Sequence, residues 1–319
     1  MERLPEKYRT GSVLVDSGDL FFYFNVFLLS FSGFCLLYIL LNILFKRCNY
    51  FFSKEDLATK SEDDKFWRVQ GWVLITHHFL AVTLSIRTLY SSCLTGDSDE
   101  EPRWQWIRSD ECFAMVSPRF ATIVLMSIGF LSFDYILMRM CLQNQKPKVV
   151  KQTFVHHLVA ICGFLTAIIS GYSFPGIACL GLLSEISSIF LAFNDQMKHK
   201  GTSMLLFLNS LGFFISYTVI RMIGFPICLY LMSWSVYTFH SQVSYLRLFC
   251  MLVSTLQGVL ITLLNFYWYY FVVKKLIRTV NEMKAKNNSD DDFQRANGEG
   301  NGASGSRKRA NLDDDYCMD

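Results

Sequence analysis

The chain has 319 residues, of which 52% are hydrophobic, 16% are aromatic and only 18% are charged. A soluble globular domain carries about 25% charged residues, so this composition excludes a surface that faces water on all sides. The net charge of +3 gives no reason to expect a nucleic-acid partner. The apolar excess instead predicts an integral membrane protein whose partners are membrane lipids.

Seven apolar stretches are long enough to span a membrane, which needs about 20 mostly apolar residues. The N-terminal residues 1–19 stay charged for too long to open a cleavable signal peptide, so the apolar run that follows is expected to be a signal anchor and the first span. We predict an all-α fold, a polytopic membrane helical bundle of about seven transmembrane helices. The candidate spans are 20–45, 71–90, 120–142, 153–171, 174–193, 204–234 and 246–273.

Two local features shape these spans. The fourth and fifth are joined by little more than "GYSF", which predicts a tight helical hairpin. The sixth is long and contains Gly224 and Pro226, which predict a kink or a broken helix.

Lysine and arginine follow the first, third, fifth and seventh spans. Because cytosolic flanks of membrane helices carry an excess of these residues, the pattern predicts a lumenal or extracellular region 1–19 and a cytosolic C-terminus. Residues 20–64 are then the first transmembrane anchor and a basic cytosolic loop. Arg3, Lys7 and Arg9 argue against this orientation.

Two further expectations concern the loops and the tail. Cys93 and Cys112 bracket the lumenal loop and form either a disulfide or two free thiols. Residues 276–319 are rich in Gly, Ser, Asn and alternating charges, so they are expected to form a disordered cytosolic tail.

Polar and ionisable side chains inside the spans are the strongest functional signal, because each ionisable group costs at least about 2.5–3.5 kcal/mol on insertion. Most of them lie in the cytosolic half and the centre of their spans, which predicts a shared polar cavity open to the cytosol. Two adjacent histidines project about 100° apart on a helix, so one pair cannot easily chelate one ion and no metal site is expected. The candidate cavity residues are His77, His78, Asp134, His156, His157, Glu185, Arg221 and Asn265.

These residues also have purely structural interpretations. Asp134 could pair with Arg139 near the membrane edge, and a pair of Glu185 with Arg221 could simply hold two helices together. The histidine pairs could be interfacial residues that backbone groups or water satisfy.

Several stretches resemble the TLC domain family, named for translocation-associated, longevity-assurance and ceroid-lipofuscinosis membrane proteins. They occur in order over residues 65–275, and they imply an all-helical bundle around a lipid-accessible cavity. Within "FVHHLVAI" the resemblance favours His157 over His156 as the residue that points inward. The stretches are "QGWVLITHHFLAVTLSIRTLY", "SIGFLSFDYILMRM", "FVHHLVAI", "LLSEISSIFLAF", "IRMIGFPI" and "LLNFYWYYFVVKK".

The chain departs from the ceramide synthases of this family. Those enzymes carry His-Asp-x-x-Ser-Asp about one span after the histidine pair, whereas this chain has "LLSEISS", with Glu185 and neither histidine nor aspartate. Ala160 stands where the resemblance implies a threonine. The chain therefore resembles the branch that does not synthesise ceramide, and whether it is an enzyme is left open.

Two functions follow from this resemblance. In the first, the protein holds a lipid in its polar cavity, with Arg221 attracting a phosphate or carboxylate, and acts in membrane lipid homeostasis. In the second, it is a divergent acyltransferase in which His157 is the general base, Glu185 orients His157, and acyl-CoA is a substrate. No cofactor is expected in either case.

Other roles are less favoured. A trafficking factor remains an alternative, whereas a seven-span receptor lacks support because the third span has no acid-Arg-aromatic triplet and the last has no Asn-Pro-x-x-Tyr. The resemblance favours the endoplasmic reticulum over the plasma membrane, and a homo- or hetero-oligomer is left open.

Overall fold

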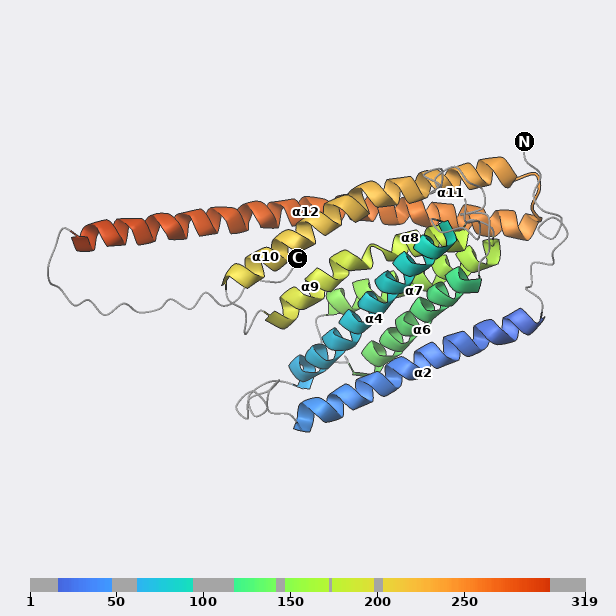
Figure 1. The fold of residues 1–319 in the computed structure, drawn as a ribbon, viewed down its shortest axis with the longest axis horizontal. Helices are drawn as coiled ribbons and strands as arrows, with labels where there is room; N and C mark the ends of the chain where they lie inside the picture. Colours follow the sequence, from blue (N-terminus) through green and yellow to red (C-terminus); the bar gives the residue numbers. More distant parts are fainter. Residues whose placement is uncertain are drawn as a thin grey trace. The chain divides into compact units, whose positions relative to one another are not determined.

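The computed structural model describes residues 17–47, 62–93, 118–141, 147–171, 174–197 and 203–298, which are almost entirely helical and contain no strand (Figure 1). Seven helical stretches are long and apolar enough to cross a membrane, which confirms the predicted fold class. They are Leu20–Phe45, Phe66–Tyr90, Phe120–Met140, Thr153–Ser170, Phe174–Asn194, Met204–Phe239 and Tyr245–Arg278. The chain divides into two compact units, Met1–Val272 and Val273–Asp319.

Within the first unit, α2 (Ser17–Arg47) packs against α6 (Pro118–Cys141) and α4 (Glu62–Cys93), as Figure 1 shows. The approach of α2 to α6 depends on small residues, because a Cβ atom on Gly129 would lie 2.8 Å from Oγ of Ser30. Helices in membranes associate largely through such close packing. Phe34 of α2 joins Phe130 and Phe133 of α6 in an aromatic cluster that fixes this corner of the bundle.

The predicted hairpin of the fourth and fifth spans is present. α7 (Pro147–Ser170) is followed by Gly171, whose φ of 65° lies in the left-handed region that favours glycine. The amide N–H of Gly171 donates to the carbonyl oxygens of Ala167 and Ile168 and closes the helix. α8 (Phe174–Leu182) begins three residues later and packs against α7, α6 and α4.

The fifth span is interrupted, which the sequence did not predict. A turn at Leu183 and Ser184 separates α8 from α9 (Glu185–Met197). Around this turn the backbone N–H groups bond to the carbonyl three residues earlier, as in the bond from Ser187 to Ser184. Non-helical backbone at membrane depth is tolerated where neighbouring protein groups satisfy it, so the turn marks a site of unusual contacts.

The sixth span is continuous but not uniform. α10 (Ser203–Ser216) passes into a π-helix, η1 (Tyr217–Gly224), and then into α11 (Phe225–Phe239). The predicted irregularity therefore takes the form of a widened turn rather than a break. Pro226 lies in the first turn of α11 and has no N–H for the usual bond to the preceding turn, which explains why the α-helical pattern is lost just before it.

The last helix, α12, runs from Tyr245 to Gly298. The sequence predicted that residues 276–319 are disordered, whereas residues 276–298 continue this helix. They contain no proline and no glycine before Gly298 that would end it. The remainder of the predicted tail, 299–319, lies outside the described residues. So does Cys112, and the disulfide with Cys93 stays a prediction.

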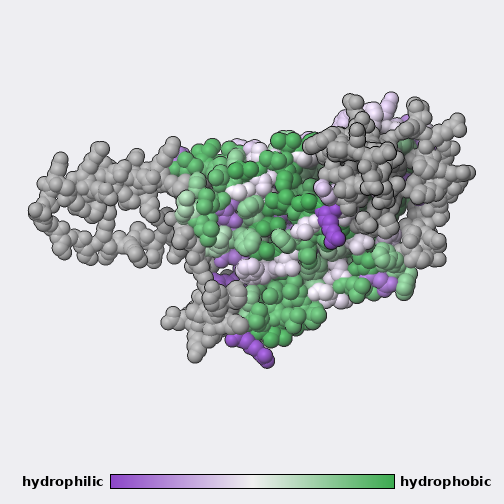
Figure 2. Space-filling view, viewed as in Figure 1, coloured by the Kyte–Doolittle hydropathy of each residue, from purple (hydrophilic) through white to green (hydrophobic). Residues whose placement is uncertain are grey.

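Large apolar side chains are exposed along the spans, most densely on α2, α10, α11 and α12. Figure 2 shows hydrophobic residues over much of the coloured surface of this face. Such exposure is expected where lipid tails surround a bundle, and it contrasts with the polar residues that the bundle encloses.

Candidate functional site

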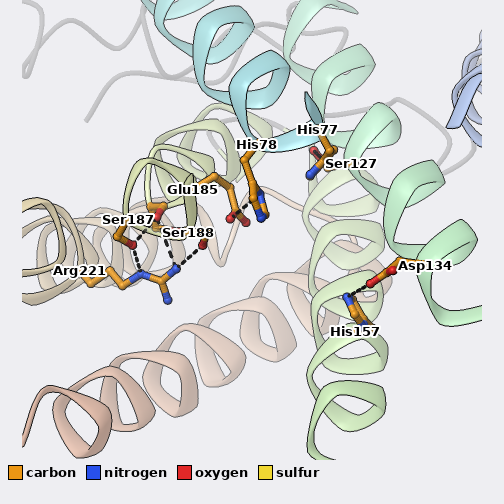
Figure 3. Close-up of polar contacts among 10 residues, drawn as sticks. His77, His78, Ser127, Asp134, His157, Glu185, Ser187, Ser188 and Arg221 are labelled. Carbon is orange, nitrogen blue, oxygen red and sulfur yellow. Dashed lines mark hydrogen bonds and ion pairs between the residues drawn. The ribbon is translucent and has the colours of Figure 1, made fainter. Parts of the chain in front are cut away.

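Asp134 of α6 lies between one polar side chain from α7 and one from α4. Its Oδ2 atom is 3.1 Å from Nε2 of His157, and its Oδ1 atom accepts a hydrogen bond from Nε2 of Gln70. All three residues are buried. Because Nε2 of Gln70 faces a carboxylate, the amide orientation is fixed and its Oε1 atom is left without a partner. Figure 3 shows the His157–Asp134 contact.

A second histidine–carboxylate pair joins α4 to α9. Nδ1 of His78 lies 2.8 Å from Oε2 of Glu185, and the two side chains face each other in Figure 3. Glu185 is the first residue of α9, so its negative charge lies at the positive end of the helix dipole. The Glu185 side chain keeps 23% of its exposure, whereas those of His157 and Asp134 keep 7% and 6%.

His77 belongs to the aromatic packing rather than to either pair. Its ring stacks on Phe130 with centroids 3.8 Å apart and planes 9° apart, and Phe34 meets it edge-on. Its Nε2 atom lies 3.4 Å from Oγ of Ser127. His77 therefore lies between His78 and the aromatic corner that Phe34 of α2 helps to form.

Arg221 lies in the π-helix and bonds to the interrupted fifth span. Its Nε donates to Oγ of Ser187 at 2.8 Å, and its Nη2 donates to Oγ of Ser188 at 2.9 Å and to the carbonyl oxygen of Ser184 at 3.4 Å (Figure 3). That carbonyl also accepts from the backbone N–H and the hydroxyl of Ser187, so the arginine adds a third, longer contact at the turn. The two irregular helical segments thus meet at one side chain.

Asn265 of α12 completes this side of the site. Its Oδ1 atom accepts from Nη1 of Arg221 at 3.4 Å, and the Tyr217 hydroxyl lies 3.2 Å from the Asn265 carbonyl oxygen and 3.4 Å from Oδ1. The Tyr217 ring also lies under the guanidinium, with the Arg221 carbon 5.2 Å from its centroid. Asn265 is only 2% exposed, and its Nδ2 atom has no partner.

The adjacent histidines of α7 point in different directions. His157 is buried, as the sequence favoured, and His156 is exposed. The two rings remain neighbours, with centroids 5.8 Å apart, so the accessible His156 ring lies beside His157.

A family model described as the TLC domain matches residues 66–274. The chain belongs to the TLC domain family. The matched range contains every polar residue of the site and leaves out α2, which contributes aromatic packing around His77. A comparison with curated proteins finds no matching relative.

The described contacts of the predicted polar residues fall into groups, with His157 on Asp134, His78 on Glu185 and Arg221 on Asn265, and two predicted pairings differ. Glu185 was expected to orient His157, yet it contacts His78, and Asp134 contacts His157. Helix neighbours explain this, because α4 packs against α9 while α7 packs against α6. The described contacts also differ from two structural alternatives: Asp134 contacts His157 and Gln70, and the described partners of Arg221 are neutral oxygen atoms.

Sequence reasoning missed several contributors. Gln70 precedes His77 by seven residues, two turns of the same helix, and this spacing could have placed it on the same face. The serines of α9 carry no comparable signal, because their role depends on the unforeseen turn. The described residues contain no group of three or more His, Cys, Asp or Glu side chains suited to a metal ion.

Proposed function

We propose that this TLC-domain protein holds the polar headgroup of a membrane lipid among the polar side chains of its candidate site. Through this binding it acts in membrane lipid homeostasis. The observation that carries the proposal is the meeting of ionisable side chains from several helices inside membrane-spanning segments. Such groups raise the free energy of membrane insertion. Where they are found, they usually pair with one another and mark a ligand site or a pathway. The site residues contribute from α4, α6, α7, α9, η1 and α12.

The chemistry of the cluster supports a lipid as the ligand. Arg221 and Asn265 offer hydrogen-bond donors inside the spans, so they can hold a headgroup that accepts hydrogen bonds. Exposed apolar side chains on the surrounding helices suit the acyl chains of the same molecule. We place this activity in the non-synthase branch of the family, because "LLSEISS" lacks the synthase motif. An endoplasmic reticulum location and a cytosolic C-terminus belong to the same proposal.

A divergent acyltransferase is the second candidate, and the His157–Asp134 pair is the observation that favours it. A buried carboxylate 3.1 Å from Nε2 of a histidine can fix the ring and stabilise its protonated form. Nδ1 of His157 is unpaired and could then accept a proton from a hydroxyl or amine acceptor. The donor substrate would be an acyl-CoA.

One experiment separates the two functions. The protein is purified in mild detergent, co-purifying lipids are identified by mass spectrometry, and acyl-CoA is then added with an amine or a lysolipid. Bound lipid without turnover supports the lipid-holding role, whereas an acylated product that disappears in His157→Ala supports the enzyme. His240→Ala is the control, because His240 is exposed and bonds to the Tyr237 carbonyl at the end of α11. Absence of both lipid and product from the folded protein contradicts both functions.

A further inference from the structure

The hydrogen-bonding capacity of Arg221 is not fully used. A guanidinium has five N–H groups. Nε and Nη2 donate to Ser187, Ser188 and the Ser184 carbonyl, whereas Nη1 makes one long contact of 3.4 Å to Asn265. Within the described part of the chain, one N–H of Nη1 is therefore available to a ligand.

A second unused donor belongs to Asn265, the residue whose Oδ1 atom contacts Nη1. Nη1 of Arg221 can only donate, so the atom of the Asn265 amide that faces it is the acceptor Oδ1. Nδ2 of the same amide then has no acceptor among the described residues, although Asn265 is only 2% exposed. A buried donor left unpaired is costly and calls for an occupant that accepts hydrogen bonds.

The charges around this pair of donors limit the occupant. The described hydrogen-bond partners of Arg221 are neutral serine, carbonyl and amide oxygens, so none of them directly neutralises its positive charge. Glu185 directly follows Ser184, whose carbonyl contacts Arg221, but its carboxylate pairs with His78. One negative charge would offset the guanidinium, whereas a second would be opposed by Glu185.

We propose that Nη1 of Arg221 and Nδ2 of Asn265 form a binding site for a singly charged oxyanion on an amphiphile, either a phosphodiester or a carboxylate. This inference rests on the proposed function, because it names the chemical class of the lipid that the cluster holds. Dianionic phosphate monoesters are disfavoured, and so are neutral alcohols of the same chain length.

The test uses matched ligands with the full-length protein in detergent micelles. Competition against a fluorescent lipid compares phosphatidylglycerol, a monoanionic diester, with neutral diacylglycerol and with phosphatidic acid. It also compares oleate with oleyl alcohol at a pH that ionises the acid. We expect the favoured monoanion to bind at least about tenfold more tightly than its neutral counterpart, since charge-assisted hydrogen bonds are among the stronger ones. Water-soluble glycerophosphoglycerol should compete far less well than phosphatidylglycerol, because it lacks the chains.

Two substitutions at one position sharpen the test. Asn265→Leu removes the donor. It should lower the affinity for the favoured monoanion about tenfold and leave the affinity for the neutral lipid unchanged. Asn265→Asp gives Arg221 a carboxylate partner, which should preserve thermal stability while abolishing the preference for the anion. Gln257→Leu is the control, since Gln257 is an amide on the same helix that contacts Thr166 instead.

The outcomes separate this inference from the function on which it rests. Equal binding of anionic and neutral lipids, stronger binding of phosphatidic acid, or an anion preference that survives Asn265→Asp would overturn the inference while leaving a lipid-holding protein. Competition by glycerophosphoglycerol equal to that of phosphatidylglycerol would replace the lipid with a soluble headgroup and overturn it too. A folded protein that binds no lipid at all would remove the proposed function itself.

Discussion

The two histidine–carboxylate pairs differ in their surroundings, although they share the same chemistry. His157 and Asp134 are both buried, and Gln70 covers the second carboxylate oxygen. His78 pairs with a glutamate that is 23% exposed and that directly follows Ser184, a partner of Arg221. The first pair joins two regular helices, whereas the second begins at the turn that interrupts the fifth span.

This difference separates two tasks within one cluster. A sealed pair loses much stability when one partner is removed, because the other charge stays buried. A pair that is partly open and close to a guanidinium controls the local charge that a ligand meets. Stability should therefore depend mainly on Asp134, and ligand choice mainly on Glu185.

The largest expected effect is on stability. Asp134→Ala should lower the free energy of unfolding by about 3 kcal/mol, since it leaves His157 and Gln70 buried without their partner. Glu185→Ala should cost clearly less. Thermal unfolding of both variants in the same detergent checks this order, and an equal or reversed order would break the comparison between the pairs.

A change in ligand preference of about tenfold is expected from Glu185→Gln. Loss of this negative charge removes the repulsion of a second negative charge on the ligand. The affinity for phosphatidic acid should therefore rise relative to that for phosphatidylglycerol. Competition binding measures the ratio. Asp134→Asn serves as the comparison, and a similar shift there would show that the two carboxylates act alike.

A smaller loss, about 1 kcal/mol, is expected from Gln70→Met, which removes one amide hydrogen bond but keeps the volume of the side chain. Thermal unfolding measures the loss. The effect should nearly vanish when Asp134 is already replaced by Ala, and a double-mutant cycle tests this coupling. Independent effects of the two substitutions would contradict the contact.

The smallest effect is expected from His156→Ala, at less than about 0.5 kcal/mol, because the ring is exposed. His157→Ala should cost several times more, as its partner Asp134 would remain buried. Unfolding curves of the two adjacent variants provide the measurement. Similar losses would mean that both histidines face the interior.

The spans and the identity of the polar residues could be predicted because membrane depth makes each polar side chain conspicuous in the sequence. Helix geometry predicted that only one of His156 and His157 points inward, and the family resemblance favoured His157. The partners were not, because they depend on which helices are neighbours: Glu185 faces His78 only because α9 packs on α4.

Irregular backbone was the least predictable feature. Gly224 and Pro226 predicted an irregular sixth span, but these residue types do not distinguish a kink from a π-helix. Nothing comparable marks the turn at Leu183 and Ser184, where the sequence remains that of an ordinary helix. The contacts of Arg221 follow from both irregularities, which is why its pairing with Glu185 was a reasonable but wrong alternative.

The π-helix of the sixth span also has an evolutionary consequence. A π-helical turn holds more residues than an α-helical turn, so η1 behaves like an α-helix that has accepted an inserted residue. An insertion of this kind swings one side chain into the interior without changing the rest of the span. Relatives that are one residue shorter in this segment should therefore carry a straight sixth span and should lack an arginine in contact with the fifth.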